Sequence, residues 1–242
     1  MKARCYFKNS ILHEILSKAR LVAFDMNGLI IDDEEVQLES VNLALSQFRI
    51  TIDEERWIRE CVGKRADIYF KAILEEHGII AGADEVNKIV QEKNKLYRAL
   101  IEREVKSLIR PGVRELITYI AEGKTQILAL VTSALEHEIE TILGEKGLDL
   151  KDRFQYIISG ADVSKSKPDP QIYVILTCRS GVPPQDCLVF EDSGPGVDAA
   201  HGAGMPCIAM PNCFTRSHDF SNAAYVIDSL TSDARLLTPP VL

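Results

Sequence analysis

Four short stretches of the sequence carry reactive or charged side chains directly after apolar runs that read as strands. In chain order these side chains are Asp25, then Thr132 and Ser133, then Lys165, Lys167 and Asp169, and finally Glu191 and Asp192. A carboxylate can act as a nucleophile, hydroxyl and amide groups can bind an anion, and an acidic pair can hold a hard cation. Ligands bind beyond the carboxyl ends of strands in open parallel sheets, so we expect these stretches to meet at one sheet edge.

Six apolar runs predict the strands that must position these side chains. Their ranges are 20–25, 126–131, 155–158, 187–190, 206–210 and 225–227. Helical patterns lie between them, at 112–123, 135–147, 170–180 and 194–203. Short apolar strands that alternate with helices predict an α/β fold, with a doubly wound, mostly parallel, Rossmann-like sheet covered by helices on both faces.

The stretch 33–108 breaks this alternation. It contains no convincing strand and reads as several helices, two of which open at Glu54-Glu55 and at Asp84-Glu85. The sheet pattern resumes after Arg110-Pro111-Gly112, where the proline favours a boundary. We therefore predict a Rossmann-like catalytic core of residues 1–32 and 109–242, with a small all-helical domain, residues 33–108, inserted after the first strand.

The composition excludes several classes of protein. The chain has 28 basic and 36 acidic residues, and its net charge of −8 argues against nucleic acid as a partner. No apolar run approaches the ~20 residues that span a bilayer, so no membrane association is expected. Six cysteines without a Cys-x-x-Cys pair argue against zinc and favour reduced thiols. We therefore expect a cytoplasmic protein, with a monomer as the default state.

The first twenty residues combine basic side chains with apolar side chains at helical spacing. Their apolar region is too short for a secretory signal. Glu14 interrupts the positive charge, so a short helix that docks on the core is favoured over a transit peptide.

The four stretches also match a known set of motifs. They are Phe24-Asp25-Met26-Asn27-Gly28-Leu29-Ile30, Leu130-Val131-Thr132-Ser133, Ser166-Lys167-Pro168-Asp169-Pro170-Gln171-Ile172-Tyr173 and Phe190-Glu191-Asp192-Ser193-Gly194-Pro195-Gly196-Val197-Asp198-Ala199-Ala200. In this order and spacing they resemble the haloacid dehalogenase-like superfamily, specifically its phosphatase and β-phosphoglucomutase-like branch with a helical cap. The resemblance covers residues 20–230.

The resemblance implies a magnesium-dependent reaction at Asp25. In the family this first aspartate attacks phosphorus and becomes an aspartyl-phosphate, which a carboxylate can do because it is already ionised at neutral pH. The implied Mg²⁺ ligands are Asp25, the main-chain carbonyl of Asn27, and Asp192, with Glu191 binding directly or through water. Alternatively, or in addition, Glu191 and Asp192 cap the helix that follows them.

The resemblance also assigns the groups that bind the phosphoryl group. Thr132 matches the family's hydroxyl donor, and the main-chain amide of Ser133 would add a second donor. The alternative is that this pair only caps the next helix. Lys167 matches the lysine that bridges nucleophile and phosphate. Lys165 is a rival two residues earlier, but the family places its lysine directly before the proline, so Lys165 is expected to be a surface charge.

One position departs from the family pattern. Phosphatases of the family carry a second aspartate, the general acid and base, two residues after the nucleophile, and here that position is Asn27. An amide does not exchange a proton usefully near neutral pH. Three explanations stay open: an engineered change that traps an intermediate, a natural feature of a weak or silent relative, or replacement by another acid among Asp32, Asp33, Glu34 and Glu35.

The expected substrate is a small phosphorylated metabolite such as a sugar phosphate. Lys64 and Arg65 form a basic pair in the inserted domain, which either meets a second anionic group of the substrate or simply opens a solvated helix. The best-known mutase of the family carries an arginine a little further along this loop, where Ala66 stands here, and this difference favours a phosphatase over a phosphosugar mutase. A catalytically impaired, phosphate-binding regulatory relative is a third hypothesis, and Asn27 is the main reason for it.

Overall fold

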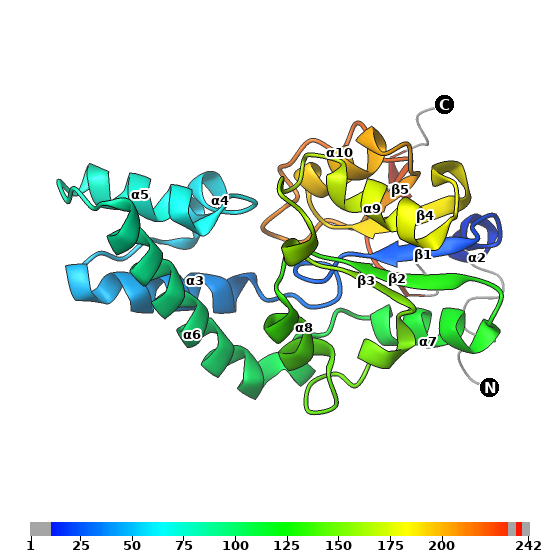
Figure 1. Ribbon diagram of the computed structural model, residues 1–242, viewed down its shortest axis with the longest axis horizontal. Helices are drawn as coiled ribbons and strands as arrows, with labels where there is room; N and C mark the ends of the chain where they lie inside the picture. The colour runs from blue at the N-terminus through cyan, green and yellow to red at the C-terminus, as the bar shows by residue number, and fades with distance from the viewer. Residues whose placement is uncertain (1–10, 232–235, 239–242) are drawn as a thin grey trace. The chain divides into compact units, whose positions relative to one another are not determined.

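The structure is a computed structural model that describes residues 11–231 and 236–238 (Figure 1). Contacts between Cα atoms divide the chain into two compact units. The first, the core unit, comprises Met1–Asp32 and Val105–Leu242, and the second, the helical unit, comprises Asp33–Glu104.

The core unit is built on one seven-stranded sheet. Its strands are β1 (Leu21–Phe24), β2 (Ile127–Val131), β3 (Tyr156–Ile158), β4 (Cys187–Glu191), β5 (Cys207–Ala209), β6 (Tyr225–Ile227) and β7 (Leu236–Thr238). Their order is β3-β2-β1-β4-β5-β6-β7; the first six are parallel, and β7 pairs antiparallel with β6. The predicted doubly wound sheet is confirmed, and the antiparallel β7 is an addition to it. The chain moves outward in opposite directions from β1 and from β4, so a ligand crevice is expected where these two strands end.

The ends of the central strands are held in register. Phe24 lies opposite Leu130 of β2 and Phe190 of β4, and the rings of Phe24 and Phe190 stack with their centroids 4.9 Å apart. The amide of Asp25 then donates a hydrogen bond of 3.0 Å to the Phe190 carbonyl. Because every residue of β1 is buried, apolar side chains fix this strand from both faces and place Asp25 directly at its carboxyl end.

Helices cover both faces of the sheet (Figure 1). They are α2 (Ile11–Leu16), α7 (Val113–Gly123), α8 (Glu136–Leu143), α9 (Gln171–Ser180) and α10 (Gly194–Gly202). α9 and α10 pack on one face around Leu21, Ala23 and Val131. The short helix predicted near the N-terminus is α2, whose Leu12 and Leu16 are buried; residues 1–10 lie outside the described part.

The helix predicted over 135–147 was too long, because α8 ends at Leu143. A side chain at Gly144 would have its Cβ 2.4 Å from the Glu140 carbonyl oxygen, and one at Gly147 would have its Cβ 2.3 Å from that of Ile142. The chain makes a tight turn over the end of α8 that only glycine permits at these two positions.

The helical unit contains α3 (Glu34–Leu45), η1 (Ser46–Phe48), α4 (Glu54–Glu60), α5 (Ala66–Glu76) and most of α6 (Ala83–Leu108). Residues 33–104 are all described and form no strand, as the sequence predicted. Asp53 caps α4 by accepting a hydrogen bond of 2.8 Å from the Arg56 amide, so this helix opens at Glu54 as expected. Among the described residues, no helix is sufficiently long and apolar to span a bilayer.

The two segments that lead from the core unit into the helical unit run side by side. Ile31 and Ile109 form an antiparallel bridge. The amide of Asp32 donates to the Leu108 carbonyl at 2.8 Å, and the amide of Arg110 donates to the Ile30 carbonyl at 3.0 Å. Arg110 therefore marks the return of the chain to the core, and it lies beside the turn that follows β1.

Candidate active site

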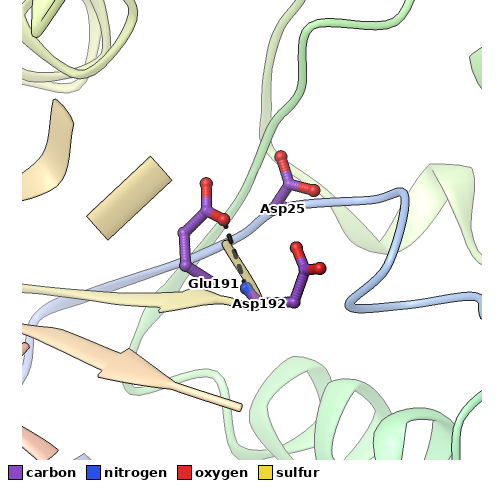
Figure 2. Close-up of side chains that lie close together, drawn as sticks. All are labelled: Asp25, Glu191 and Asp192. Atoms are coloured by element: carbon purple, nitrogen blue, oxygen red, sulfur yellow. Dashed lines mark hydrogen bonds between the residues drawn. The ribbon is translucent and has the colours of Figure 1, made fainter. Parts of the chain in front are cut away.

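Three carboxylates gather where β1 and β4 end. Asp25 follows β1, Glu191 is the last residue of β4, and Asp192 comes next (Figure 2). One oxygen from each carboxylate lies within 4.8 Å of the others, and the three residues are at most 8% exposed. Carboxylate oxygens are the ligands that hard divalent cations prefer. The sequence expectation that Asp25, Glu191 and Asp192 meet at one sheet edge is confirmed.

Lys167 connects two of these carboxylates. Its Nζ atom lies 2.6 Å from Oδ1 of Asp25 and 2.5 Å from Oε1 of Glu191, and it also donates to the Val131 carbonyl at 3.3 Å. Lys167 therefore sits between the ends of β1, β2 and β4. Lys165, in contrast, is exposed and pairs with Asp169 at 3.3 Å, as expected of a surface charge.

The buried charged groups shift one another's pKa values. Burial raises the pKa of Asp25 to about 7, with Glu191 adding to the rise and Lys167 opposing it. Burial alone would lower the pKa of Lys167, but the Asp25 and Glu191 carboxylates raise it above its usual value, so the ammonium stays charged. One ammonium balances only part of the charge on three carboxylates. A divalent cation therefore fits this donor set both in ligand type and in charge.

Glu191 is surrounded by protein donors. Its Oε1 atom accepts from Lys167 and from the Tyr173 hydroxyl at 3.0 Å, and its Oε2 atom accepts from the Ser193 hydroxyl and the Asp192 amide, both at 3.2 Å. A Cβ at Gly196 would lie 2.1 Å from the Glu191 carboxyl carbon. Gly196 thus leaves the space that the carboxylate fills at the start of α10.

Asp192 lies against the turn that follows β1. Gly28 has a positive φ of 78°, and a Cβ there would lie 2.2 Å from Oδ2 of Asp192. Glycine at this position permits both the left-handed turn and the close approach of the carboxylate. Asn27, just before it, is half-buried and bridges to Ile31 through its main chain.

Thr132 and Ser133 follow β2, beside the Val131 carbonyl that accepts from Lys167. Thr132 is 1% exposed, and its hydroxyl oxygen accepts from the Ala134 amide at 3.1 Å. The residue that caps α8 is Leu135, so Thr132 and Ser133 do not serve as its cap. Similarly, Ser193 caps α10 by accepting from the Gly196 amide, so the alternative of a Glu191-Asp192 cap is not observed.

The basic pair Lys64 and Arg65 belongs to the helical unit, and both side chains are exposed. The guanidinium of Arg65 makes two hydrogen bonds to the Asp67 carboxylate, at 3.0 and 2.9 Å. Arg65 is the N-cap residue of α5 and its side chain makes no cap hydrogen bond. The pair therefore does open a helix, and one of its two charges is engaged locally.

Two of the acids considered as replacements for the missing aspartate, Asp33 and Glu34, have partners of their own. Asp33 accepts from the Tyr97 hydroxyl at 2.7 Å and from the Gln37 amide at 3.0 Å. Glu34 accepts from the indole N–H of Trp57 at 2.9 Å. All of these contacts lie within the helical unit.

Three residues near the carboxylates had no role in the sequence interpretation. The sequence places Tyr173 within a motif without a role of its own and Arg110 at a domain boundary, and it assigns no role to Asn212. The Arg110 guanidinium donates to the carbonyls of Gly28, Met210 and Pro211 at 2.7, 2.8 and 3.1 Å. Asn212 follows β5, so the rule that polar residues after strands line the site was a signal that pointed to it.

Comparisons with known proteins identify the family of this chain. The sequence profile of the haloacid dehalogenase-like hydrolases matches residues 22–210. A phosphoglycolate phosphatase from Pseudomonas savastanoi pv. phaseolicola is 27% identical over 233 residues, which are 92% of this chain and 84% of that protein. A phosphorylated carbohydrates phosphatase from Thermotoga maritima is 30% identical over 185 residues, which are 76% of this chain and 81% of that protein.

Among solved structures, an aspartate-to-asparagine mutant of CbbY from Rhodobacter sphaeroides, in complex with xylulose-(1,5)bisphosphate, has a TM-score of 0.78 at 24% identity and covers 88% of this chain and 95% of that one. This likeness establishes the shared fold. The matched profile and the named relatives show that the chain belongs to the haloacid dehalogenase-like hydrolases and is an enzyme of their phosphatase kind.

Proposed function

We propose that this protein hydrolyses a small phosphomonoester, such as a sugar phosphate, in a magnesium-dependent reaction with Asp25 as the nucleophile. The contact of Lys167 with Asp25 and Glu191, beside Asp192, is the observation that carries the proposal. This cluster provides a nucleophile, an ammonium group for the phosphoryl group, and oxygen ligands for a metal ion, all within one buried site. The names of the relatives, phosphoglycolate phosphatase and phosphorylated carbohydrates phosphatase, support a small phosphorylated metabolite as substrate.

In the proposed first step, an Asp25 oxygen attacks phosphorus, the bond to the substrate oxygen breaks, and an aspartyl-phosphate forms. Lys167 keeps Asp25 ionised and balances charge on the phosphoryl oxygens, while the Thr132 hydroxyl and the Ser133 amide donate to them. Mg²⁺, when held by Asp25, the Asn27 carbonyl and Asp192, supplies further neutralisation of those oxygens. Water then attacks the aspartyl-phosphate and releases inorganic phosphate.

Asn27 limits this cycle. The departing alkoxide needs a proton and the attacking water must lose one, and an amide supplies neither function. General acid and base catalysis is worth about 10²–10⁴-fold, so we propose a turnover reduced by about that factor. Glu191 has four protein donors, and we assign it to holding Lys167 and to contact with the metal through water.

We propose that the inserted helical domain, residues 33–108, acts as the substrate-selecting cap. Lys64 and Arg65 are its candidates for binding a second anionic group of the substrate, and Arg65 would exchange Asp67 for that group. Asn27 also favours a second function: a phosphate-binding, regulatory relative that is phosphorylated but hardly turns over.

The proposal is tested by phosphate release from p-nitrophenyl phosphate and a panel of small phosphomonoesters, with Mg²⁺, in the unsubstituted protein and in Asp25→Asn. The matched control is Asp186→Asn, a half-buried aspartate that pairs with Arg20 directly before β4. We expect slow, metal-dependent release that Asp25→Asn abolishes and Asp186→Asn leaves unchanged. Full activity in Asp25→Asn would reject the nucleophile, whereas a phosphorylated protein without phosphate release would favour the regulatory function.

A further inference from the structure

Asn212 connects the loop after β5 with the carboxylate cluster. It is 7% exposed, and its Nδ2 atom donates to Oδ2 of Asp192 at 3.1 Å and to the Gly28 carbonyl at 3.4 Å. One amide group thus contacts both the proposed metal ligand Asp192 and the turn that follows the nucleophile strand.

The orientation of the Asn212 amide is fixed by its surroundings. Its Oδ1 atom accepts from the amides of Phe214 and Thr215 at 2.9 and 3.0 Å and from the Thr215 hydroxyl at 3.2 Å. In return, the Asn212 main-chain amide donates to the Thr215 hydroxyl oxygen at 3.0 Å. A flipped amide would point its NH₂ group at two N–H donors, so the NH₂ group must face Asp192.

The other side of Asp192 is equally constrained. The carboxylate lies so close to Gly28 that no Cβ fits between them. The Gly28 carbonyl is itself held at 2.7 Å by Arg110, which also binds the Met210 and Pro211 carbonyls just before Asn212. Asp192 therefore lies between two segments that Arg110 ties together, and the Asn212 amide donates to it from one of these segments.

We propose that Asn212 is a positioning residue for Asp192 and that it raises the affinity of the carboxylate cluster for Mg²⁺. This inference rests on the proposed role of Asp192 as a metal ligand. A carboxylate that is already oriented loses less conformational freedom when it binds a cation, and hydrogen-bond partners of metal ligands typically contribute 10–100-fold to metal affinity. Asn212 does not touch the reacting atoms, so its effect reaches the reaction only through Asp192.

The test is titration calorimetry of the folded protein with Mg²⁺ alone, without substrate. In Asn212→Ser the hydroxyl can still accept from the following amides, as serine does in such turns, but it no longer offers an NH₂ group to Asp192. The matched control is Asn222→Ser, which removes an amide that donates to Asp198 at 2.8 Å on the exposed surface of the same unit. We expect the Mg²⁺ dissociation constant to rise by about 10–100-fold in Asn212→Ser and to stay unchanged in Asn222→Ser.

A second variant, Thr215→Val, removes the hydroxyl that orients Asn212 and should weaken Mg²⁺ binding in the same direction but less. It provides the test if Asn212→Ser does not fold. Asp192→Asn separates the two proposals. If this variant binds Mg²⁺ as tightly as the unsubstituted protein does, the role of Asp192 as a metal ligand is rejected. Binding that Asp192→Asn abolishes, but that Asn212→Ser and Thr215→Val leave unchanged, would reject only the role of Asn212.

Discussion

The Nζ atom of Lys167 lies 2.6 Å from Oδ1 of Asp25, and both side chains are close to fully buried. Burial pushes the Asp25 carboxyl toward its neutral, unreactive form, and the pKa of Asp25 is raised to about 7 even with Lys167 beside it. The contact with Lys167 opposes this shift. Lys167 therefore has two roles: it favours the ionised form of Asp25, and it balances the negative charges of the neighbouring carboxylates.

Lys167→Met is therefore predicted to impair activity and stability together. Removal of one preorganised donor to the phosphoryl group typically lowers turnover about 10²–10³-fold. Without Lys167, the buried carboxylates of Asp25 and Glu191 lose the cation beside them, and removing one partner of a buried ion pair costs about 3–5 kcal/mol of unfolding free energy at neutral pH. Urea unfolding in a metal chelator measures the second effect. The control is Lys165→Met, whose exposed side chain should change stability by no more than about 0.5 kcal/mol; equal losses in both variants would contradict the prediction.

The close approach of the Glu191 carboxylate to Gly196 leads to a second prediction. A Cβ at this position would lie 2.1 Å from the Glu191 carboxyl carbon, so Gly196→Ala must push Glu191 away from Lys167 and Tyr173. We expect a loss of about 1–3 kcal/mol in unfolding free energy, as for other overpacked sites, together with lower activity. Gly202→Ala in the same helix would only bring its Cβ 3.4 Å from Pro170, and it should be neutral or slightly stabilising. Denaturant unfolding of the two variants gives the comparison, and equal stability would show that Glu191 relaxes freely.

The loop that leads from β3 toward Lys167 provides a pH-dependent prediction. Hydrogen bonds from the Ser159 amide, followed by contacts with Arg179, lower the pKa of Asp162 below its usual value. An aspartate with a lowered folded-state pKa stabilises the protein above its unfolded pKa of about 4, and this contribution is lost as the pH falls through the folded-state value.

We therefore expect Asp162→Asn to cost about 1 kcal/mol near neutral pH, with a difference that shrinks below about pH 4. Urea unfolding of both proteins across this range measures it. Arg179→Met should show a smaller effect with the same trend, because the Ser159 contacts remain. A stability difference between Asp162→Asn and the unsubstituted protein that is independent of pH would mean that charge is not the cause.

The sequence predicted the strands that bring the site together, because buried parallel strands appear in a sequence as short apolar runs. Asp25 and Asp192 follow such runs, and Lys167 directly precedes a proline at a position that matches the family. Their convergence could therefore be predicted without knowing how the side chains pack. The end of α8 at Leu143 was missed because the closeness of Gly144 and Gly147 to main-chain carbonyls exists only in the folded turn. β7 was missed because three residues at a sheet edge carry no periodic pattern.

The partners of the carboxylates were harder to predict than the carboxylates themselves. Tyr173 reaches Glu191 because α9 packs on the sheet in one particular rotation, which the sequence pattern does not specify. Asn212 lies in a loop, and an isolated loop asparagine most often caps its own turn. It does so here through Oδ1, and only the tertiary structure reveals that its NH₂ group also reaches Asp192.

Asn27 leads to the final prediction. It is half-buried, two residues beyond Asp25, in the turn whose next residue, Gly28, contacts Asp192. Asn27→Asp keeps the size of the side chain and the main-chain carbonyl, and adds a group that can give a proton to the leaving oxygen and then take one from water. Turnover with Mg²⁺ should rise by about 10²–10⁴-fold, most strongly for substrates with poor leaving groups.

Steady-state phosphate release measures this gain, and single-turnover phosphorylation of Asp25 shows which step has changed. The matched control is Asn42→Asp in the helical unit, an amide bonded to the main chain of Ile52, which adds a carboxylate elsewhere and should not raise turnover. If hydrolysis of the aspartyl-phosphate limits the unsubstituted protein, a burst of the leaving alcohol equal to the enzyme concentration precedes slow turnover, and Asn27→Asp removes that burst. An unchanged rate in Asn27→Asp would mean that another group already moves these protons, and that the asparagine does not limit the enzyme.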